Sequence, residues 1–122
     1  MALKAYIVED NELIRDNLVE TLEELAGIET VGCAATEKNA CDWLHQHPRD
    51  WQLLVLDLFL LEGTGLGVLM KCTRRANDQK VVILSNYATH EIRARCMASG
   101  ADAIFDKSTE LDQFFEYCSA VH

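Results

Sequence analysis

The stretch at residues 53–65, LLVLDLFLLEGTG, constrains the fold more than any other part of the chain. Four consecutive apolar residues, 53–56, are typical of a strand that is buried on both faces of a parallel sheet. The run stops at a single acidic residue, Asp57, and an unpaired carboxylate has no place inside such a strand. We therefore expect Asp57 at the carboxyl end of the strand, where an open parallel sheet binds its ligands. Gly63 and Gly65 then turn the chain into the next helix.

The rest of the chain repeats this alternation. Strands are predicted at 5–8, 28–33, 53–56, 81–84 and 103–105. Four helices are predicted to follow an amino-terminal cap: from Asn11 to Gly27, from Thr36 to Pro48, from Thr89 to Ser99, and from Ser108 or Thr109 to Tyr117. A further helix is predicted over 66–75. The first helix carries apolar residues at helical spacing, namely Leu13, Ile14, Leu18, Leu22 and Leu25. The pattern predicts one domain over residues 1–122: an α/β fold with a doubly wound five-stranded parallel sheet, helices on both faces and right-handed crossovers.

Charge and cysteine content exclude several classes of protein. The formal net charge is -9, from 20 acidic and 11 basic residues, and the basic residues do not cluster, which argues against direct contact with nucleic acid. The five cysteines are odd in number and form no Cys-x-x-Cys pair, so neither a disulfide framework nor a zinc site is indicated. The amino terminus, MALKAYIVED, is typical of neither a signal peptide nor a membrane span. We expect a soluble, cytoplasmic protein without membrane contact.

Polar side chains follow four of the predicted strands: Glu9 and Asp10, Asp57, Ser85, and Lys107. Strand ends in a parallel sheet lie along one edge, so we expect these groups to share a crevice. A divalent cation relieves the repulsion among gathered carboxylates, and oxygen ligands favour a hard ion such as Mg²⁺. A lysine and a hydroxyl opposite them suit a phosphoryl group, and Asp57 would then attack it to form an acyl phosphate.

This set of residues resembles the receiver domain of two-component response regulators, over essentially the whole chain. The resemblance implies a flavodoxin-like fold with strand order 2-1-3-4-5. It implies that Asp57 accepts phosphate from a phosphohistidine on a sensor histidine kinase or phosphotransfer protein. Asp10, Asp57 and the backbone carbonyl of Phe59 would bind Mg²⁺, with Glu9 acting through water. Ser85 and Lys107 would contact the phosphoryl group.

The resemblance also implies a signalling phosphoacceptor rather than an enzyme, apart from assisting its own phosphotransfer and slow autodephosphorylation. Its output would be a downstream protein or an output domain after residue 122, or a dimer that depends on phosphorylation. The family signals through its last strand and the flanking helices. The residues implied for that surface are Ile92, Arg95, Ile104 and Phe114, and those implied for kinase docking are Ile14, Arg15 and Leu18.

Several positions depart from the family pattern. Leu61 replaces the loop proline, Ser108 the proline after the lysine, and Asn86 the small residue after the hydroxyl. Ile104 stands where the family has a switch aromatic, and strand alternation points the neighbouring Phe105 to the other face of the sheet.

Two aromatic residues, Phe59 and Tyr87, occupy the positions that flank the phosphoryl group in the family. Both rings would hinder the hydrolytic water, which leads to the hypothesis of a long-lived acyl phosphate.

Other functions remain open on the residues alone. An aspartyl-phosphate phosphatase resembles this pattern but needs an acidic residue where this chain has Phe59, and a flavodoxin needs a phosphate-binding loop where this chain has the acidic EDNE. A pseudo-receiver would keep the fold and bind partners without being phosphorylated. Taken singly, Asp57 is also typical of a loop cap, Lys107 of a surface charge, and Ser85 of a turn residue.

Overall fold

Strands and helices alternate strictly through the computed structural model, which describes residues 3–71 and 75–120. The strands are β1 (Lys4–Val8), β2 (Glu29–Ala34), β3 (Leu53–Asp57), β4 (Lys80–Ser85) and β5 (Ala103–Asp106). The helices are α1 (Glu12–Ala26), α2 (Glu37–Gln46), α3 (Gly65–Met70), α4 (His90–Ala98) and α5 (Leu111–Ala120).

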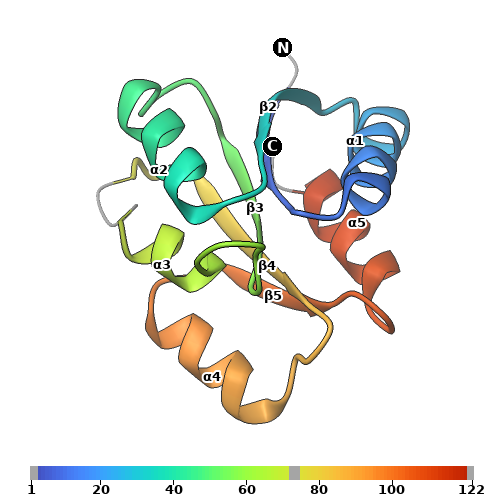
Figure 1. Cartoon of the computed structure of the whole chain (residues 1–122). Helices are drawn as coiled ribbons and strands as arrows, with labels where there is room; N and C mark the ends of the chain where they lie inside the picture. Colours follow the sequence, from blue (N-terminus) through green and yellow to red (C-terminus); the bar gives the residue numbers. More distant parts are fainter. Residues whose placement is uncertain (1–2, 72–74, 121–122) are drawn as a thin grey trace.

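The strands form one parallel sheet in the order β2-β1-β3-β4-β5 (Figure 1). Both the doubly wound α/β fold and the implied strand order are therefore confirmed. The order places β3 at the centre, paired with β1 on one side and β4 on the other, while β2 and β5 are the edges. No helix within the described ranges is long and apolar enough to cross a membrane.

Each face of the sheet has its own hydrophobic core, because side chains alternate along a strand. Leu53 and Val55 of β3 pack with α1 and α5, whereas Leu54 and Leu56 pack with α2, α3 and α4. Figure 1 shows the same division, with α1 and α5 on one side of the sheet and the other three helices opposite. The four apolar residues of β3 are buried as predicted, and Asp57 at the carboxyl end of the strand is buried as well.

Three predicted helix boundaries were wrong, one of them the end of the last helix, which runs past the predicted Tyr117 to Ala120. The third helix ends at Met70, where the Lys71 N–H bonds to the Val68 carbonyl and closes the last turn, and Arg75 lies outside it. The remainder of that prediction, 72–74, lies outside the described residues. The last helix begins at Leu111 rather than after Ser108 or Thr109, because the Asp106 carboxylate accepts both of their backbone N–H groups and holds them in a turn.

The helical spacing of apolar residues predicted a wider buried face for α1 than the structure has. Leu18 and Leu22 are buried, but Leu13 is 82% exposed and Leu25 is 63% exposed. Leu13 lies five residues before Leu18, which at about 100° per residue turns it well away from the core. Leu25 lies in the last turn, before the left-handed Gly27 ends the helix as predicted.

Candidate functional site

The carboxyl ends of four neighbouring strands carry the polar residues that the sequence singled out. Glu9 follows β1, Asp57 and Ser85 are the last residues of β3 and β4, and Lys107 follows β5. Backbone hydrogen bonds between neighbouring strands fix the positions of these residues relative to one another. The Lys107 N–H donates to the Ser85 carbonyl at 3.0 Å, and the Leu58 N–H donates to the Leu84 carbonyl at 3.1 Å. The sheet register therefore places these residues side by side.

Three carboxylates meet at this edge of the sheet. Glu9, Asp10 and Asp57 each offer an oxygen within 4.8 Å of the others. Glu9 is 2% exposed and Asp57 8% exposed, whereas Asp10 faces solvent. Loss of water around its carboxyl group, and then the neighbouring Glu9, raise the pKa of Asp10 above its usual value.

Lys107 supplies the positive charge of the site. Its Nζ donates to a Glu9 oxygen and, at 2.9 Å, to Asp57 Oδ2, and its side chain is 8% exposed. Burial opposes this charge, but the hydrogen bonds to Glu9 and Asp57 outweigh it and raise the pKa of Lys107. Three carboxylates against one ammonium leave the site with a formal charge of -2. The donor set therefore fits a hard divalent cation.

The remaining contacts orient Asp57 and Ser85. Asp57 Oδ1 accepts a long hydrogen bond of 3.4 Å from the Phe59 N–H, so both oxygens of the carboxylate are held. Ser85 is fully buried, and its Oγ accepts the Tyr87 N–H at 3.1 Å. The hydroxyl keeps its own proton free to donate to an anion at the site.

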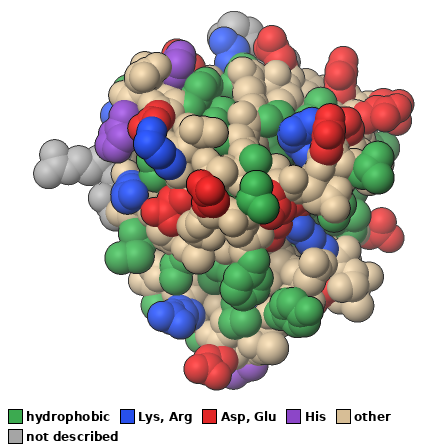
Figure 2. All heavy atoms as spheres, viewed as in Figure 1, with side chains coloured by type: hydrophobic (Ala, Val, Ile, Leu, Met, Phe, Trp, Pro, Cys, Tyr) green, Lys and Arg blue, Asp and Glu red, His purple; other side chains and the backbone are tan. Residues whose placement is uncertain are grey.

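Two exposed aromatic residues, Phe59 and Tyr87, lie two positions after Asp57 and Ser85 in the sequence. Phe59 and Tyr87 are 53% and 67% exposed, and their rings meet edge to face with centroids 6.4 Å apart. They come from the loops after β3 and β4, so the rings connect the two loops that directly follow Asp57 and Ser85. On the face seen in Figure 2, hydrophobic and acidic side chains are interspersed and basic ones are scattered.

The side chains of β5 divide as strand alternation predicts. Ile104 joins the core under α4, while Phe105 lies on the other face, with ring centroids 6.0 Å from Phe114 and 5.8 Å from Tyr117. The position of the family's switch aromatic is thus filled by a buried aliphatic side chain.

Three residues implied for docking surfaces lie inside the protein. Phe114 is fully buried and Ile104 is 9% exposed, so neither belongs on a partner surface, and Leu18 at 1% is excluded from kinase docking. Each points from its helix or strand into a core rather than outward. The other four residues keep some exposure: Ile14, Arg15, Ile92 and Arg95.

Glu37 organises the loop after β3, although nothing in the sequence singled it out. Its carboxylate accepts the Thr64 N–H at 3.0 Å and the Lys71 ammonium at 3.2 Å, and its own N–H donates to the Glu62 carbonyl. These bonds lower the pKa of Glu37, the Thr64 bond most of all. The loop packs so closely that a Cβ on Gly63 would lie 2.4 Å from the Cβ of Glu37.

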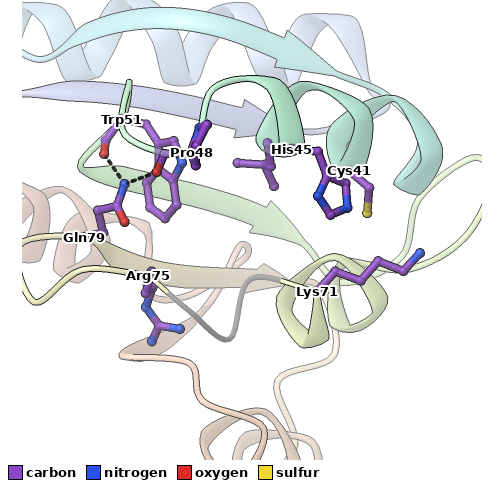
Figure 3. A pocket seen from close by; sticks show the side chains of 8 residues that line it. Cys41, His45, Pro48, Trp51, Lys71, Arg75 and Gln79 are labelled. Carbon is purple, nitrogen blue, oxygen red and sulfur yellow. Dashed lines mark hydrogen bonds between the residues drawn. The ribbon is translucent and has the colours of Figure 1, made fainter.

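A cavity of about 160 Å³ lies at the opposite end of β3 and β4 (Figure 3). The buried Gln79 amide donates to the carbonyls of Pro48 and Trp51 at 2.9 Å each, the bonds drawn in Figure 3. Its oxygen accepts the Ala76 N–H and the Arg49 guanidinium. Gln79 thus ties the loop before β3 to the segment before β4, and this cavity is separate from the carboxylate site.

Comparison with known proteins gives a consistent result. A family model described as the response regulator receiver domain matches residues 5–119. Response regulator UvrY of Escherichia coli K12 is 27% identical over 105 residues, which are 86% of this chain and 47% of that protein. The chain therefore spans about half the length of the curated relatives it matches.

Solved structures show the same fold. The receiver domain of Francisella response regulator 1452 superposes with a TM-score of 0.83 at 22% identity, covering 98% of this chain and 95% of that one. A response regulator from Burkholderia pseudomallei, solved with a phosphorylated aspartic acid, a calcium ion and citrate, gives 0.81 at 19% identity, covering 97% and 67%.

Proposed function

This chain belongs to the receiver domains of two-component response regulators, and we propose that Asp57 is its phosphoacceptor, working with Mg²⁺. The observation that carries the proposal is the setting of Asp57. Its buried carboxylate is held by the Lys107 ammonium at 2.9 Å and lies within 4.8 Å of two further carboxylates. A phosphorylated aspartic acid in the Burkholderia pseudomallei structure, which shares the fold, supports the same chemistry.

The proposed reaction is a phosphoryl transfer from a phosphohistidine on a sensor histidine kinase or phosphotransfer protein. An Asp57 oxygen attacks phosphorus, the phosphorus–nitrogen bond breaks, and the imidazole nitrogen leaves with the bonding electrons. Lys107 and the Ser85 hydroxyl then stabilise the phosphoryl oxygens, by charge and by a donated hydrogen bond. Asp10 and Asp57, with the Phe59 carbonyl and with Glu9 through water, would hold Mg²⁺, which when bound supplies further positive charge to those oxygens.

The partners proposed are the phosphate donor on one side and a downstream protein or output domain on the other. The response regulators it resembles are about twice as long as this chain, which supports an output domain in the full protein. We propose a cytoplasmic signalling role in which the phosphorylated state changes partner binding, including the formation of a dimer. The chain would act on no substrate other than its own acyl phosphate.

The test is the intact mass after incubation with acetyl phosphate, with and without Mg²⁺. We expect a gain of one phosphoryl group only with Mg²⁺, and no gain in Asp57→Asn. Asp50→Asn is the matched control, because it removes an exposed carboxylate away from the site and should be labelled like the wild type. No gain in the wild type, under conditions that label a known receiver, would refute the proposal and favour a pseudo-receiver.

A further inference from the structure

Arg93 of α4 joins three segments that are separate in the sequence. Its Nε donates to the Ala88 carbonyl at 2.8 Å, in the loop after β4, and its Nη1 reaches the Ile104 carbonyl of β5 at 3.5 Å. Its Nη2 donates to the carboxylate of Glu110, just before α5. Three different nitrogens of the planar guanidinium reach the three acceptors, whereas the three donors of an ammonium all lie on one nitrogen.

Glu110 extends this network toward the phosphoacceptor site. The oxygen that pairs with Arg93 also accepts the Asp106 N–H at 3.0 Å, and Asp106 directly precedes Lys107. The Arg93 hydrogen bond, and then the Asp106 N–H, lower the pKa of Glu110. The Asp106 carboxylate in turn accepts the Ser108 N–H at 2.7 Å, so the backbone on both sides of Lys107 is held.

The network also reaches Ser85, through the loop after β4. Ser85 Oγ accepts the Tyr87 N–H at 3.1 Å, and the next residue, Ala88, is the one whose carbonyl Arg93 holds. A serine hydroxyl that accepts one hydrogen bond still donates its proton, so movement of Ser85 toward a phosphoryl group would pull Tyr87 and Ala88 with it. That displacement acts directly on Arg93.

We infer that Arg93 and Glu110 are positioning residues. They hold the loop after β4, which follows Ser85, against the loop after β5, which begins with Lys107, and they connect the movement of both loops to α4 and α5. The inference rests on the proposed function of Asp57. It accounts for a structural problem in this chain, since the buried Ile104 side chain has no ring whose rotation would carry the phosphorylation state outward. The ion pair between Arg93 of α4 and Glu110, the residue before α5, provides the connection instead.

The test compares amide NMR spectra of the chain in Mg²⁺, with and without beryllofluoride as a phosphoryl mimic, for four variants. Arg93→Gln and Glu110→Gln break the network, and Arg93→Lys keeps the charge but not the fork of donors. Arg95→Gln is the matched control, because it removes the same charge from an exposed position on the same helix. The urea midpoint of each variant shows that it is folded.

We expect the wild type and Arg95→Gln to shift amides both near Asp57 and along α4 and α5. The three network variants should keep the shifts at residues 57–59 and lose those along α4 and α5. Their labelling by acetyl phosphate should slow by about tenfold or more, because Ser85 and Lys107 are less well placed. The Mg²⁺ concentration that gives half-maximal labelling should stay unchanged, since the carboxylates are intact.

Two results would overturn the inference, and they are distinguishable. If the network variants keep the wild-type shifts along α4 and α5, Arg93 and Glu110 do not connect the loops to the helices, although Asp57 remains the phosphoacceptor. If the wild type itself gains no phosphoryl mass and shows no shift at residues 57–59, the proposed function fails and the inference fails with it. Glu110→Gln keeps the test decisive if Arg93→Gln does not fold.

Discussion

Lys107→Met tests whether the carboxylate site around Asp57 is a buried ion cluster. Methionine keeps most of the length and the apolar stem of lysine but leaves Glu9 and Asp57 without their cation. All three side chains are at most 10% exposed, so water cannot replace the lost charge. The substitution therefore isolates the electrostatic part of the Lys107 contribution from its packing.

The expected cost follows from the geometry of the cluster. Removing one partner of a buried ion pair costs about 3–5 kcal/mol, and the solvent-facing Asp10 at the edge of the site places this case near the lower figure, about 3 kcal/mol. With a slope of about 2 kcal/mol per molar urea, the midpoint of unfolding should fall by about 1.5 M. The Lys107 pKa is raised in the folded state, so its stabilising effect is complete below the ordinary value of 10.5 and is lost only as pH rises through the folded pKa above it. A measurement at pH 7 records the full effect.

The assay is urea unfolding with and without Mg²⁺, with Lys38→Met as the control. Lys38 pairs with Asp42 at 3.0 Å, but these side chains are 82% and 55% exposed, so its loss should cost less than about 0.5 kcal/mol. Mg²⁺ should stabilise Lys107→Met more than the wild type, because the cation replaces the missing charge. Equal midpoints for Lys107→Met and Lys38→Met would refute the account of the site as a charged, buried cluster.

Three further perturbations follow from the same structure. Phe59→Asn with Tyr87→Glu should shorten the lifetime of the acyl phosphate by about tenfold, a barrier change of about 1.4 kcal/mol, and an unchanged rate of phosphate loss would exclude shielding by the rings. Gly65→Ala should cost about 1–3 kcal/mol in unfolding free energy and slow labelling, because its Cβ would lie 2.2 Å from the backbone oxygen of Asp57. Gly27→Ala, which meets no neighbour, should leave labelling at the wild-type rate. The pKa of Glu110 is lowered from 4.5, so its stabilising effect is present above that value and lost as pH falls through the folded pKa. Between about pH 5 and pH 3, the urea midpoint of Glu110→Gln should therefore decrease less than that of the wild type. An equally large decrease in the variant would contradict this.

The fold was predictable because β3 carries an unusually plain signal. A short apolar run that ends in one carboxylate allows few structures other than a central parallel strand, and the same pattern recurs in weaker form at β1 and β4. The placement of Glu9, Asp57, Ser85 and Lys107 followed from strand ends alone, whereas their chemical roles remain proposals. Local patterns are sufficient where a residue's position depends only on its own strand.

Positions that depend on partners distant in the sequence were not predictable. Arg93 has the sequence context of a solvated helix residue, and its carboxylate partner Glu110 lies 17 residues further along. The role of Glu37 was not predictable either, because its partners in the loop after β3, Glu62 and Thr64, lie 25 and 27 residues further along the chain. Phe114 was assigned to a surface from the family resemblance, but only the packing of α5 against β5 decides which of two adjacent phenylalanines is buried.

The ion pair between Asp57 and Lys107 links the central strand of the sheet, β3, to the end of an edge strand, β5. β3 has neighbours on both sides and lies between two cores, whereas β5 is an edge strand of four residues paired only with β4. Local opening of a native protein occurs more readily at an edge strand with few contacts than at a central strand. We therefore expect opening of β5 to withdraw the lysine while the carboxylates stay in place, so that the charge balance of the site would depend on the pairing of this edge strand.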